Sequence, residues 1–348
     1  MAAALQIGLV FETPGTYPKG PGDPDDYAAE YEPLETIRAL QSAVAAIGHA
    51  CVELGAPHDL LRALGEGALP PVDAVLSIAE GRGTRNREGW VPSLLELAGI
   101  PLLGSDALTL STSLDKAWTL ERVAAAGGRV LPYAVLDASD EVESAVLPAA
   151  FPLFVKPRWE GTAKGIHAAS LCHDRRALSR AVEEVTERYQ QPALVEAFAP
   201  GPEYTVTVVG NGPPRVLPTL QRALEADTGI GIHALERPGA PAPPPGGYHH
   251  VTPGTLEPAL EQELEAASIR AYEALECQDF ARLDFKLDRE GRACFLEINP
   301  LPTFAPDGSF GILAELAGQP YAAFVGEILA LGLERLGLAT GAQEGAAR

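Results

Sequence analysis

Residues 280–300 read FARLDFKLDREGRACFLEINP, and this stretch predicts a β-hairpin that decides the fold. Side chains alternate between the two faces of a strand, which puts Arg282, Asp284 and Lys286 on one face and Leu283, Phe285 and Leu287 on the other. A turn at 288–291 reverses the chain. In the returning strand, alternation predicts one face of Phe295, Glu297 and Asn299 against a second face of Cys294, Leu296 and Ile298.

The charged face of this hairpin predicts a metal site. Asp284 and Glu297 face each other if the strands pair as expected, and two carboxylates so placed repel unless a cation joins them. Asn299 adds a third oxygen, and hard oxygen ligands suit Mg²⁺. Arg282, two residues before Asp284, would hold an anionic oxygen. The alternative is a hairpin whose polar face is simply solvated.

A second segment, FPLFVKPRWEGTAKGI (151–166), predicts a phosphate site. An apolar strand delivers Lys156 at its end, and the chain then opens into a loop with Gly161, Thr162, Lys164 and Gly165. Backbone N–H groups of such a loop can close on phosphate oxygens. Alone this signal is weak, because an ordinary glycine-containing hairpin loop reads the same way.

A third segment, ALVEAFAPGPEYTV (193–206), carries two acids around a Pro/Gly linker. Glu196 ends one apolar strand and Glu203 begins the next, so a nucleotide's base and ribose could lodge between them. The alternative is a pair of exposed acids on a loop.

The first 110 residues predict a different arrangement of elements, an open parallel sheet with βαβαβα order. Strands are expected at 5–11, 51–54 and 73–78, and helices at 32–47, 58–64 and 90–98. A helix capped by Ser113 or Asp115 should then run to Ala126, followed by a strand at 130–136. Later segments predict strands at 166–171, 204–209 and 215–219, and helices at 174–189, 257–275 and from Tyr321 onward.

These elements predict a chain of mixed class, α/β followed by α+β, with four parts. They are an N-terminal α/β domain (1–112), a central subdomain (113–198), a C-terminal subdomain (199–340) and a frayed tail (341–348).

Composition restricts the partners. The 348 residues carry 47 acidic and 26 basic side chains, a net charge of −21, so we expect neither nucleic acid nor an anionic membrane as a partner. The four cysteines have no CxxC spacing and indicate reduced, structural thiols. We expect a cytoplasmic protein, because no stretch approaches the roughly 20 apolar residues of a membrane span and the N-terminus lacks a signal-peptide pattern.

Together the three segments resemble the ATP-grasp superfamily, and within it the D-alanine:D-alanine ligase family. Residues 80–120, EGRGTRNREGWVPSLLELAGIPLLGSDALTLSTSLDKAWTL, carry the similarity further, through a stretch that leads into an Asp115-Lys116 pair. The resemblance covers residues 70–335 in the family's order. It implies the three-subdomain ATP-grasp fold, with ATP and magnesium in the cleft.

By this resemblance, each motif position takes a role. Lys116 and Lys156 would hold the α- and β-phosphates, and the loop of Gly161, Thr162 and Lys164 would close over the γ-phosphate. Glu196, with the backbone of Ala197 and Ala199, would bind adenine, and Glu203 the ribose. The family pattern implies two Mg²⁺ ions, with Mn²⁺ as an alternative, held by Asp284, Glu297 and Asn299. Arg282 would stabilise the tetrahedral intermediate, and Ser309 would contact the carboxylate of the acceptor.

The chain also departs from the family. VFETPGTYPKG stands in place of the N-terminal His-Glu-x-x-Ser segment, whose Glu holds the first substrate's amine; Glu12 or Glu30 is the candidate substitute. Glu121 replaces a lysine expected after Lys116, and the family's mobile loop is represented only by residues 233–237. Pro302-Thr303 stands where the family has Pro-Gly.

The resemblance implies an ATP-dependent carboxylate-amine ligase acting through an acyl phosphate on amino-acid or dipeptide substrates, as a homodimer. Because the first-substrate motif is missing, we expect a nonstandard substrate. Two alternatives remain: a phosphotransferase on the same scaffold, which would release ADP without an amine, and an ATP-binding module without turnover.

Overall fold

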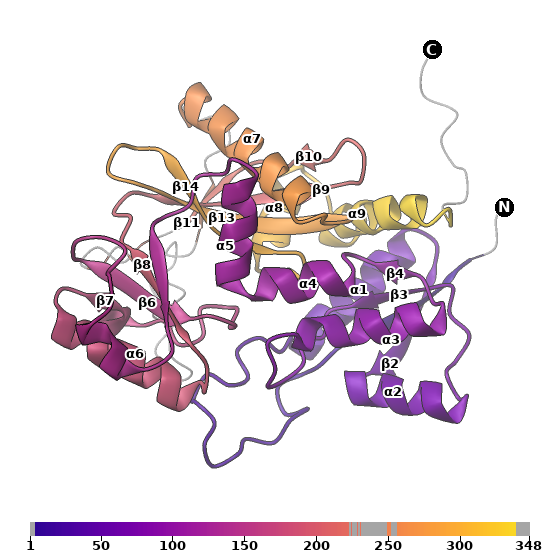
Figure 1. Cartoon of the computed structure of the whole chain (residues 1–348). Helices are drawn as coiled ribbons and strands as arrows, with labels where there is room; N and C mark the ends of the chain where they lie inside the picture. Colours follow the sequence, from indigo (N-terminus) through magenta and orange to yellow (C-terminus); the bar gives the residue numbers. More distant parts are fainter. Residues whose placement is uncertain are drawn as a thin grey trace.

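The computed structural model describes residues 4–222, 224, 228, 230, 249–251 and 256–338. Within these residues the strands form three sheets (Figure 1). The predicted loop residues 233–237, the Pro/Gly-rich segment 238–247 and the tail 341–348 lie outside the described residues.

The first sheet is parallel, with the strand order β2-β1-β3-β4. Its strands are β1 (Gln6–Val10), β2 (Ala50–Gly55), β3 (Ala74–Ser77) and β4 (Leu102–Leu103). The connecting helices are α1 (Leu34–Ala46), α2 (Pro57–Glu66) and α3 (Trp90–Ala98), the last preceded by a 3₁₀ turn, η1 (Arg87–Gly89). Parallel neighbours need such crossovers, and the predicted N-terminal open parallel sheet is confirmed.

Two helices follow where the sequence predicted one. They are α4 (Ala107–Leu114) and α5 (Lys116–Ala125). Asp115 breaks the run: its backbone is extended, and its side chain accepts a hydrogen bond from the Trp118 N–H at 3.3 Å. Ser113 therefore lies inside α4 and is no cap, while Asp115 is the cap of α5, which fixes Lys116 at the start of that helix.

The second sheet is antiparallel, with the order β5-β8-β6-β7. Its elements are β5 (Tyr133–Leu136), the 3₁₀ turn η2 (Ser139–Glu143), β6 (Leu153–Pro157), η3 (Ala168–Ser170), β7 (Leu171–Cys172), α6 (Arg175–Arg188) and β8 (Ala193–Ala197). The strand predicted at 166–171 is wrong except at Leu171, because η3 occupies 168–170. The His167 side chain accepts from the Ala169 N–H at 3.2 Å and caps that turn, so only two residues extend as β7.

The third sheet has the order β12-β11-β9-β13-β14, and β10 pairs with β9. Its strands are β9 (Glu203–Val209), β10 (Arg215–Val216), β11 (Leu220–Arg222), β12 (His249–Val251), β13 (Phe280–Leu287) and β14 (Ala293–Asn299). Helix α7 (Pro258–Ala274) packs on this sheet. The predicted strand at 215–219 is wrong in part: β10 stops at Val216, and the next strand begins at Leu220.

The β13–β14 hairpin forms as predicted, but it contains a bulge. Asp284 pairs with Glu297 as expected, whereas the next residue, Phe285, pairs with Phe295, so Leu296 is the extra residue. A bulge of one residue reverses the alternation beyond it. The prediction that Phe295 shares a face with Glu297 is therefore wrong: Phe295 packs against Phe285 in the core at 5.8 Å between ring centroids.

The C-terminal helices are α8 (Ser309–Leu316), which the sequence did not predict, and α9 (Tyr321–Arg335). Helix α9 packs against α1, and their apolar residues share one core with β1 and Phe280. Gly326 permits this close approach, because a Cβ there would lie 2.9 Å from the carbonyl oxygen of Ala43. Among the described helices none alone is long and apolar enough to cross a membrane; α8 and α9 pass such a test only as a pair, bent by 105°.

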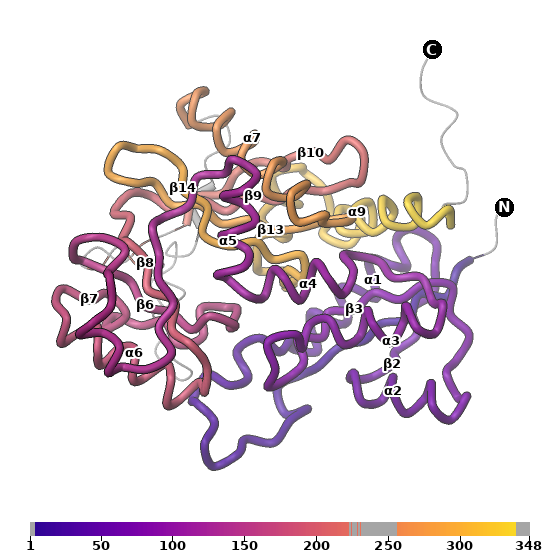
Figure 2. Tube along the Cα trace, viewed as in Figure 1, coloured from indigo at the N-terminus to yellow at the C-terminus, as the bar shows by residue number. Residues whose placement is uncertain are grey.

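The three sheets surround a common centre. In Figure 1 the parallel sheet (indigo to purple) and the unit of β6, β8 and α6 (magenta) lie below the large sheet that carries α7 (orange). The segment between β1 and α1 is a long loop that reaches from the parallel sheet toward the β6–α6 unit (Figure 2). Residues of all three parts can therefore meet at the centre. The predicted subdomain boundaries stay predictions.

Candidate active site

A cavity lies between the second and third sheets and opens to solvent. We call it the first cavity. Many of the residues predicted from the sequence line it: Lys116, Lys156, Thr162, Lys164, Glu196, Ala197, Ala199, Glu203, Arg282, Asp284 and Glu297. Its mixture of apolar walls with a few convergent charges is that of a small-molecule site.

A second cavity adjoins the first. The remaining predicted residues, Gly161, Asn299 and Ser309, line this one. Thr162, Arg222 and Arg282 line both cavities, so the two meet at these side chains. The structure therefore brings every predicted site residue to one of two neighbouring cavities.

Lys156 and Glu196 form a buried ion pair at one end of the first cavity. Lys156 lies near the end of β6 and Glu196 on the adjacent β8, with 2.7 Å between Nζ and Oε2. Burial alone would lower the pKa of Lys156, but the Glu196 carboxylate, together with Glu297, outweighs it and raises that pKa. The other oxygen of Glu196, Oε1, is buried and lacks a hydrogen-bond partner among the described residues. A ligand that donates a hydrogen bond there would satisfy it.

The loop after β6, residues 161–165, is called the glycine loop below. Thr162 and Ala163 have φ angles of 48° and 56°. This left-handed region costs a residue with a Cβ on the order of 1–3 kcal/mol, so the surrounding contacts must hold the loop. Two of them come from the β1–α1 segment: Glu30 accepts from the Gly161 N–H at 2.7 Å, and Asp26 from the Gly165 N–H at 2.8 Å.

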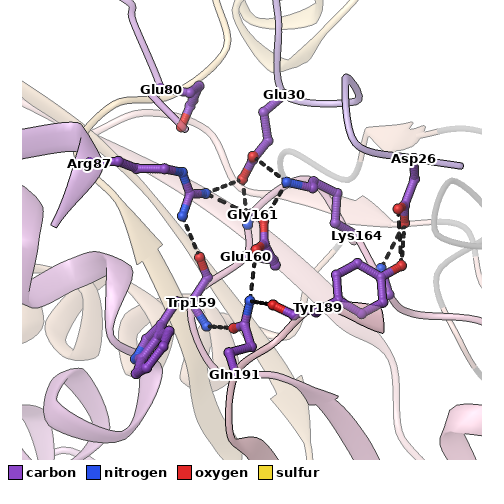
Figure 3. Close-up of polar contacts among 12 residues, drawn as sticks. Asp26, Glu30, Glu80, Arg87, Trp159, Glu160, Gly161, Lys164, Tyr189 and Gln191 are labelled. Atoms are coloured by element: carbon purple, nitrogen blue, oxygen red, sulfur yellow. Dashed lines mark hydrogen bonds and ion pairs between the residues drawn. The ribbon is translucent and has the colours of Figure 1, made fainter. Parts of the chain in front are cut away.

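Glu30 is the centre of this network (Figure 3). Its carboxylate lies 2.8 Å from Arg87 and 2.8 Å from Lys164. Burial would raise the pKa of Glu30, but Arg87 and then Lys164 outweigh it and hold the pKa at about 2. Lys164 also pairs with Glu160. The Lys164 ammonium is therefore bound by two carboxylates, those of Glu30 and Glu160.

Lys116 begins α5 and points into the site. Its Nζ donates to the Glu160 carbonyl oxygen and lies 3.5 Å from Oε2 of Glu297. The preceding Asp115 is held by Arg158 at 2.7 Å and by the indole N–H of Trp159 at 3.1 Å. Asp115 therefore fixes the start of α5, and Lys116 places a positive charge in the cavity.

The carboxylates of the hairpin face each other as predicted. Burial would raise the pKa of Glu297, but the positive charges of Lys116, Lys156 and Arg282 together outweigh it, and the pKa lies below its ordinary value. Asp284 contacts Arg282 at 3.3 Å and Arg222 at 3.1 Å. Glu297 and Asn299 both line the small space beside Lys116. Their carboxylate and amide oxygens are of the type that Mg²⁺ binds.

The second cavity contains two acids that the sequence analysis did not single out, Glu80 and Glu88. Burial, together with the charge of Glu88, raises the pKa of Glu80. Burial also raises the pKa of Glu88, to about 7. Glu80 follows β3, at the carboxyl end of a parallel strand, where ligands commonly bind, and Glu88 lies in η1. That position in the segment EGRGTRNREG was the signal that could have identified them.

Glu12 and Glu30, the candidates to replace the family's substrate-binding Glu, both have partners within the protein. Glu12 is buried and accepts from the Tyr17 hydroxyl and from the backbone N–H groups of Glu80 and Gly81, at 2.5, 3.1 and 2.9 Å. Glu30 lines the second cavity but binds Arg87, Lys164 and Gly161 as described. Glu121 is exposed on α5. Arg222, which the sequence analysis also missed, is buried at the end of β11.

The family model for the D-ala D-ala ligase C-terminus matches residues 123–330. That is more than half of the chain. The chain belongs to the D-alanine:D-alanine ligase family. The recognition made from the hairpin, the glycine loop and the Asp115-Lys116 stretch is thereby confirmed.

Relatives along most of the chain agree with this. A D-alanine–D-alanine ligase of Syntrophotalea carbinolica is 30% identical, over 85% of this chain and 90% of its own length. An uncharacterized protein of Sinorhizobium fredii, y4sG, is 29% identical over 87% and 90%. The crystal structure of D-alanine–D-alanine ligase from Bacillus anthracis complexed with ATP superposes with a TM-score of 0.68 at 20% identity, covering 95% of this chain and 98% of that one.

Family membership establishes the class of reaction. This ligase is an ADP-forming, ATP-dependent enzyme that joins a carboxylate to an amine in an amide or peptide bond. The three-subdomain ATP-grasp fold expected from the sequence is confirmed by the structural match. The family uses ATP and a divalent metal ion in general.

Proposed function

We propose that the ligase activates an amino-acid-like carboxylate in the second cavity with ATP bound in the first. The observation that carries this is the junction of the two cavities at Thr162, Arg222 and Arg282. A γ-phosphate lying at this junction is within reach of a carboxylate entering from the other side. The carboxylate attacks that phosphorus to give an acyl phosphate and ADP, and an amine then displaces phosphate to give the amide.

The nucleotide is assigned to the first cavity residue by residue. Glu196, with the backbone of Ala197 and Ala199, binds adenine, and its unpartnered Oε1 accepts from the adenine amino group. Glu203 binds the ribose hydroxyls. Lys116 and Lys156 neutralise the α- and β-phosphates, and the glycine loop, through Gly161, Thr162 and Lys164, covers the γ-phosphate.

The chain's own contribution to the chemistry is alignment and charge. Holding both reactants in one geometry is worth about 7–11 kcal/mol through effective molarity. Arg282 lines both cavities and stabilises the oxyanion of the tetrahedral intermediate, which is worth about 3–4 kcal/mol for a single donor. Ser309, at the start of α8, binds the acceptor's carboxylate through its hydroxyl and backbone N–H.

A divalent ion fits the oxygens of Glu297 and Asn299, with Asp284 facing them. When bound, Mg²⁺ or Mn²⁺ neutralises charge on the transferred phosphoryl group. The resemblance predicts two such ions.

The substrate that supplies the carboxylate is proposed to be a nonstandard amino acid or a dipeptide. Glu80 and Glu88 lie in the second cavity, no cation among the described residues lies as close to them as those of Glu30, and both have raised pKa values. An ammonium group between them would relieve the cost of burying two acids. We therefore assign the substrate amine to this pair, in the place of the absent family motif. We further propose a homodimer in the cytoplasm, acting on small molecules and binding neither nucleic acid nor membrane.

The test is a screen for ADP release over pairs of D- and L-amino acids and dipeptides. Release that requires both a carboxylate donor and an amine, with an amide product found by mass spectrometry, supports the proposal. Release with the first substrate alone would instead favour the phosphotransferase. No release with any pair would favour an ATP-binding module.

A further inference from the structure

The two carboxylates of the β13–β14 hairpin have unequal surroundings. Oδ1 of Asp284 accepts from the Thr205 hydroxyl at 2.7 Å and from Arg222 at 3.2 Å. Its Oδ2 accepts from Arg222 at 3.1 Å and from Arg282 at 3.3 Å. The Asp284 side chain is 3% exposed, whereas that of Glu297 is 26% exposed and faces the cavities. Asp284 is thus already coordinated by protein donors, and Glu297 is accessible.

Arg222 is a fixed part of this arrangement. It ends β11 and is 7% exposed. Its Nε donates to the Thr205 hydroxyl at 2.7 Å and lies 3.6 Å from Glu203. A guanidinium does not lose its proton in a protein and is hydrated more weakly than an ammonium, so it is suited to a buried position between two acids. Arg222 therefore keeps one positive charge between the two cavities.

We propose that Arg222 replaces one of the two divalent ions, so that the ligase binds a single ion, at Glu297 and Asn299. The inference rests on the proposed function. Two carboxylates that face each other need positive charge between them, and Arg222 supplies it at Asp284. A divalent ion at Asp284 would have to displace Arg222 and Arg282 together, whereas one at Glu297 and Asn299 displaces neither. Because Arg222 also lines both cavities, its charge lies beside the phosphoryl group during transfer.

Counting bound Mn²⁺ by electron paramagnetic resonance tests this directly. The full chain is titrated with MnCl₂ in the presence of a saturating non-hydrolysable ATP analogue. One Mn²⁺ per chain is expected for the wild type. In Arg222→Met, whose side chain is similar in length and uncharged, Asp284 gains room for a second ion, and two per chain are expected. Arg222→Lys keeps a positive charge and should bind one.

A matched control breaks another Arg–Asp pair, whose residues line neither cavity. Arg335 lies 2.7 Å from Asp279, and Arg335→Met should still bind one Mn²⁺. Two ions in the wild type would overturn the inference while leaving the proposed function intact, and so would a single ion in Arg222→Met. The wild-type count decides the matter if Arg222→Met does not fold. If the analogue brings no Mn²⁺ to the chain at all, the proposed function falls with the inference.

Discussion

The carboxylate of Glu30, on the segment before α1, lies 2.8 Å from the ammonium of Lys164 on the glycine loop. The same carboxylate accepts from the Gly161 N–H at 2.7 Å. The glycine loop follows a strand of the second sheet, whereas Glu30 leads into a helix of the first. One side chain therefore ties the N-terminal part of the ligase to the loop that covers the γ-phosphate in the proposed site.

Replacing this carboxylate should loosen the glycine loop. In Glu30→Gln, Lys164 and Arg87 keep Glu160 but lose their other shared negative partner, which costs less than the about 3–5 kcal/mol of a buried charge left without any partner. We expect faster hydrogen exchange at 161–165 and roughly a tenfold higher KM for ATP. Asp59→Asn, which breaks an exposed pair with Arg62, should change neither. Unchanged exchange in Glu30→Gln would show that the loop does not depend on this contact.

Glu297→Gln should abolish turnover without unfolding the protein. The amide keeps the side-chain volume but removes the charge that a divalent ion needs, so ADP release should fall by about 1000-fold or more. The melting temperature should change little, because Glu297 is partly exposed and has a single described ion pair, to Lys116. The matched control is Glu290→Gln, in the exposed turn of the same hairpin. Wild-type kinetics in Glu297→Gln would remove this residue from the metal site.

Periodicity predicted the elements whose core faces are regular. Alternation in β13 and the order of strands and helices before residue 110 gave the parallel sheet and the register of Asp284 with Glu297. The bulge at Leu296 was not predictable, because no residue there signals an extra position. The two helices around Asp115 were merged for a similar reason, since the break is a capping interaction inside a helical composition.

The site residues, too, were predictable only where the signal in the sequence is local. Residues on motif strands and loops, such as Lys156 and Asp284, were found because their spacing is local. Arg87 and Arg222 were missed, and Glu30 was predicted only as a substrate contact, because each acts across a long sequence separation. Glu30 meets a loop 131 residues away, and Arg222 meets a carboxylate 62 residues away. Only the packing of the three sheets brings them together.

The pair of Lys156 and Glu196 gives a prediction about nucleotide selection. Glu196→Gln keeps the shape of the side chain, removes the charge that raises the pKa of Lys156 and can turn an N–H toward the adenine amino group. We expect affinity for ATP to fall roughly 10- to 100-fold, about 1.4–3 kcal/mol, measured by calorimetry. GTP, which offers an acceptor at the corresponding position, should lose less. Glu184→Gln, in a half-exposed pair on α6, serves as the control. Equal losses for both nucleotides would place Glu196 away from the base.

The acids of the second cavity predict how stability depends on pH. The folded-state pKa of Glu88 is raised from 4.5 to about 7, so between these values the folded protein binds more protons than the unfolded chain. Stability must then fall as pH rises through this window, by on the order of 1–3 kcal/mol. Glu88→Gln should reduce the slope of the free energy of unfolding between pH 4.5 and 7, measured by urea titration at several pH values, and Glu80, whose pKa is also raised, should account for the slope that remains. Glu96→Gln, on the exposed face of α3, should leave the slope unchanged. A slope as steep as that of the wild type would mean that Glu88 is charged in the folded protein, with a cation beside it.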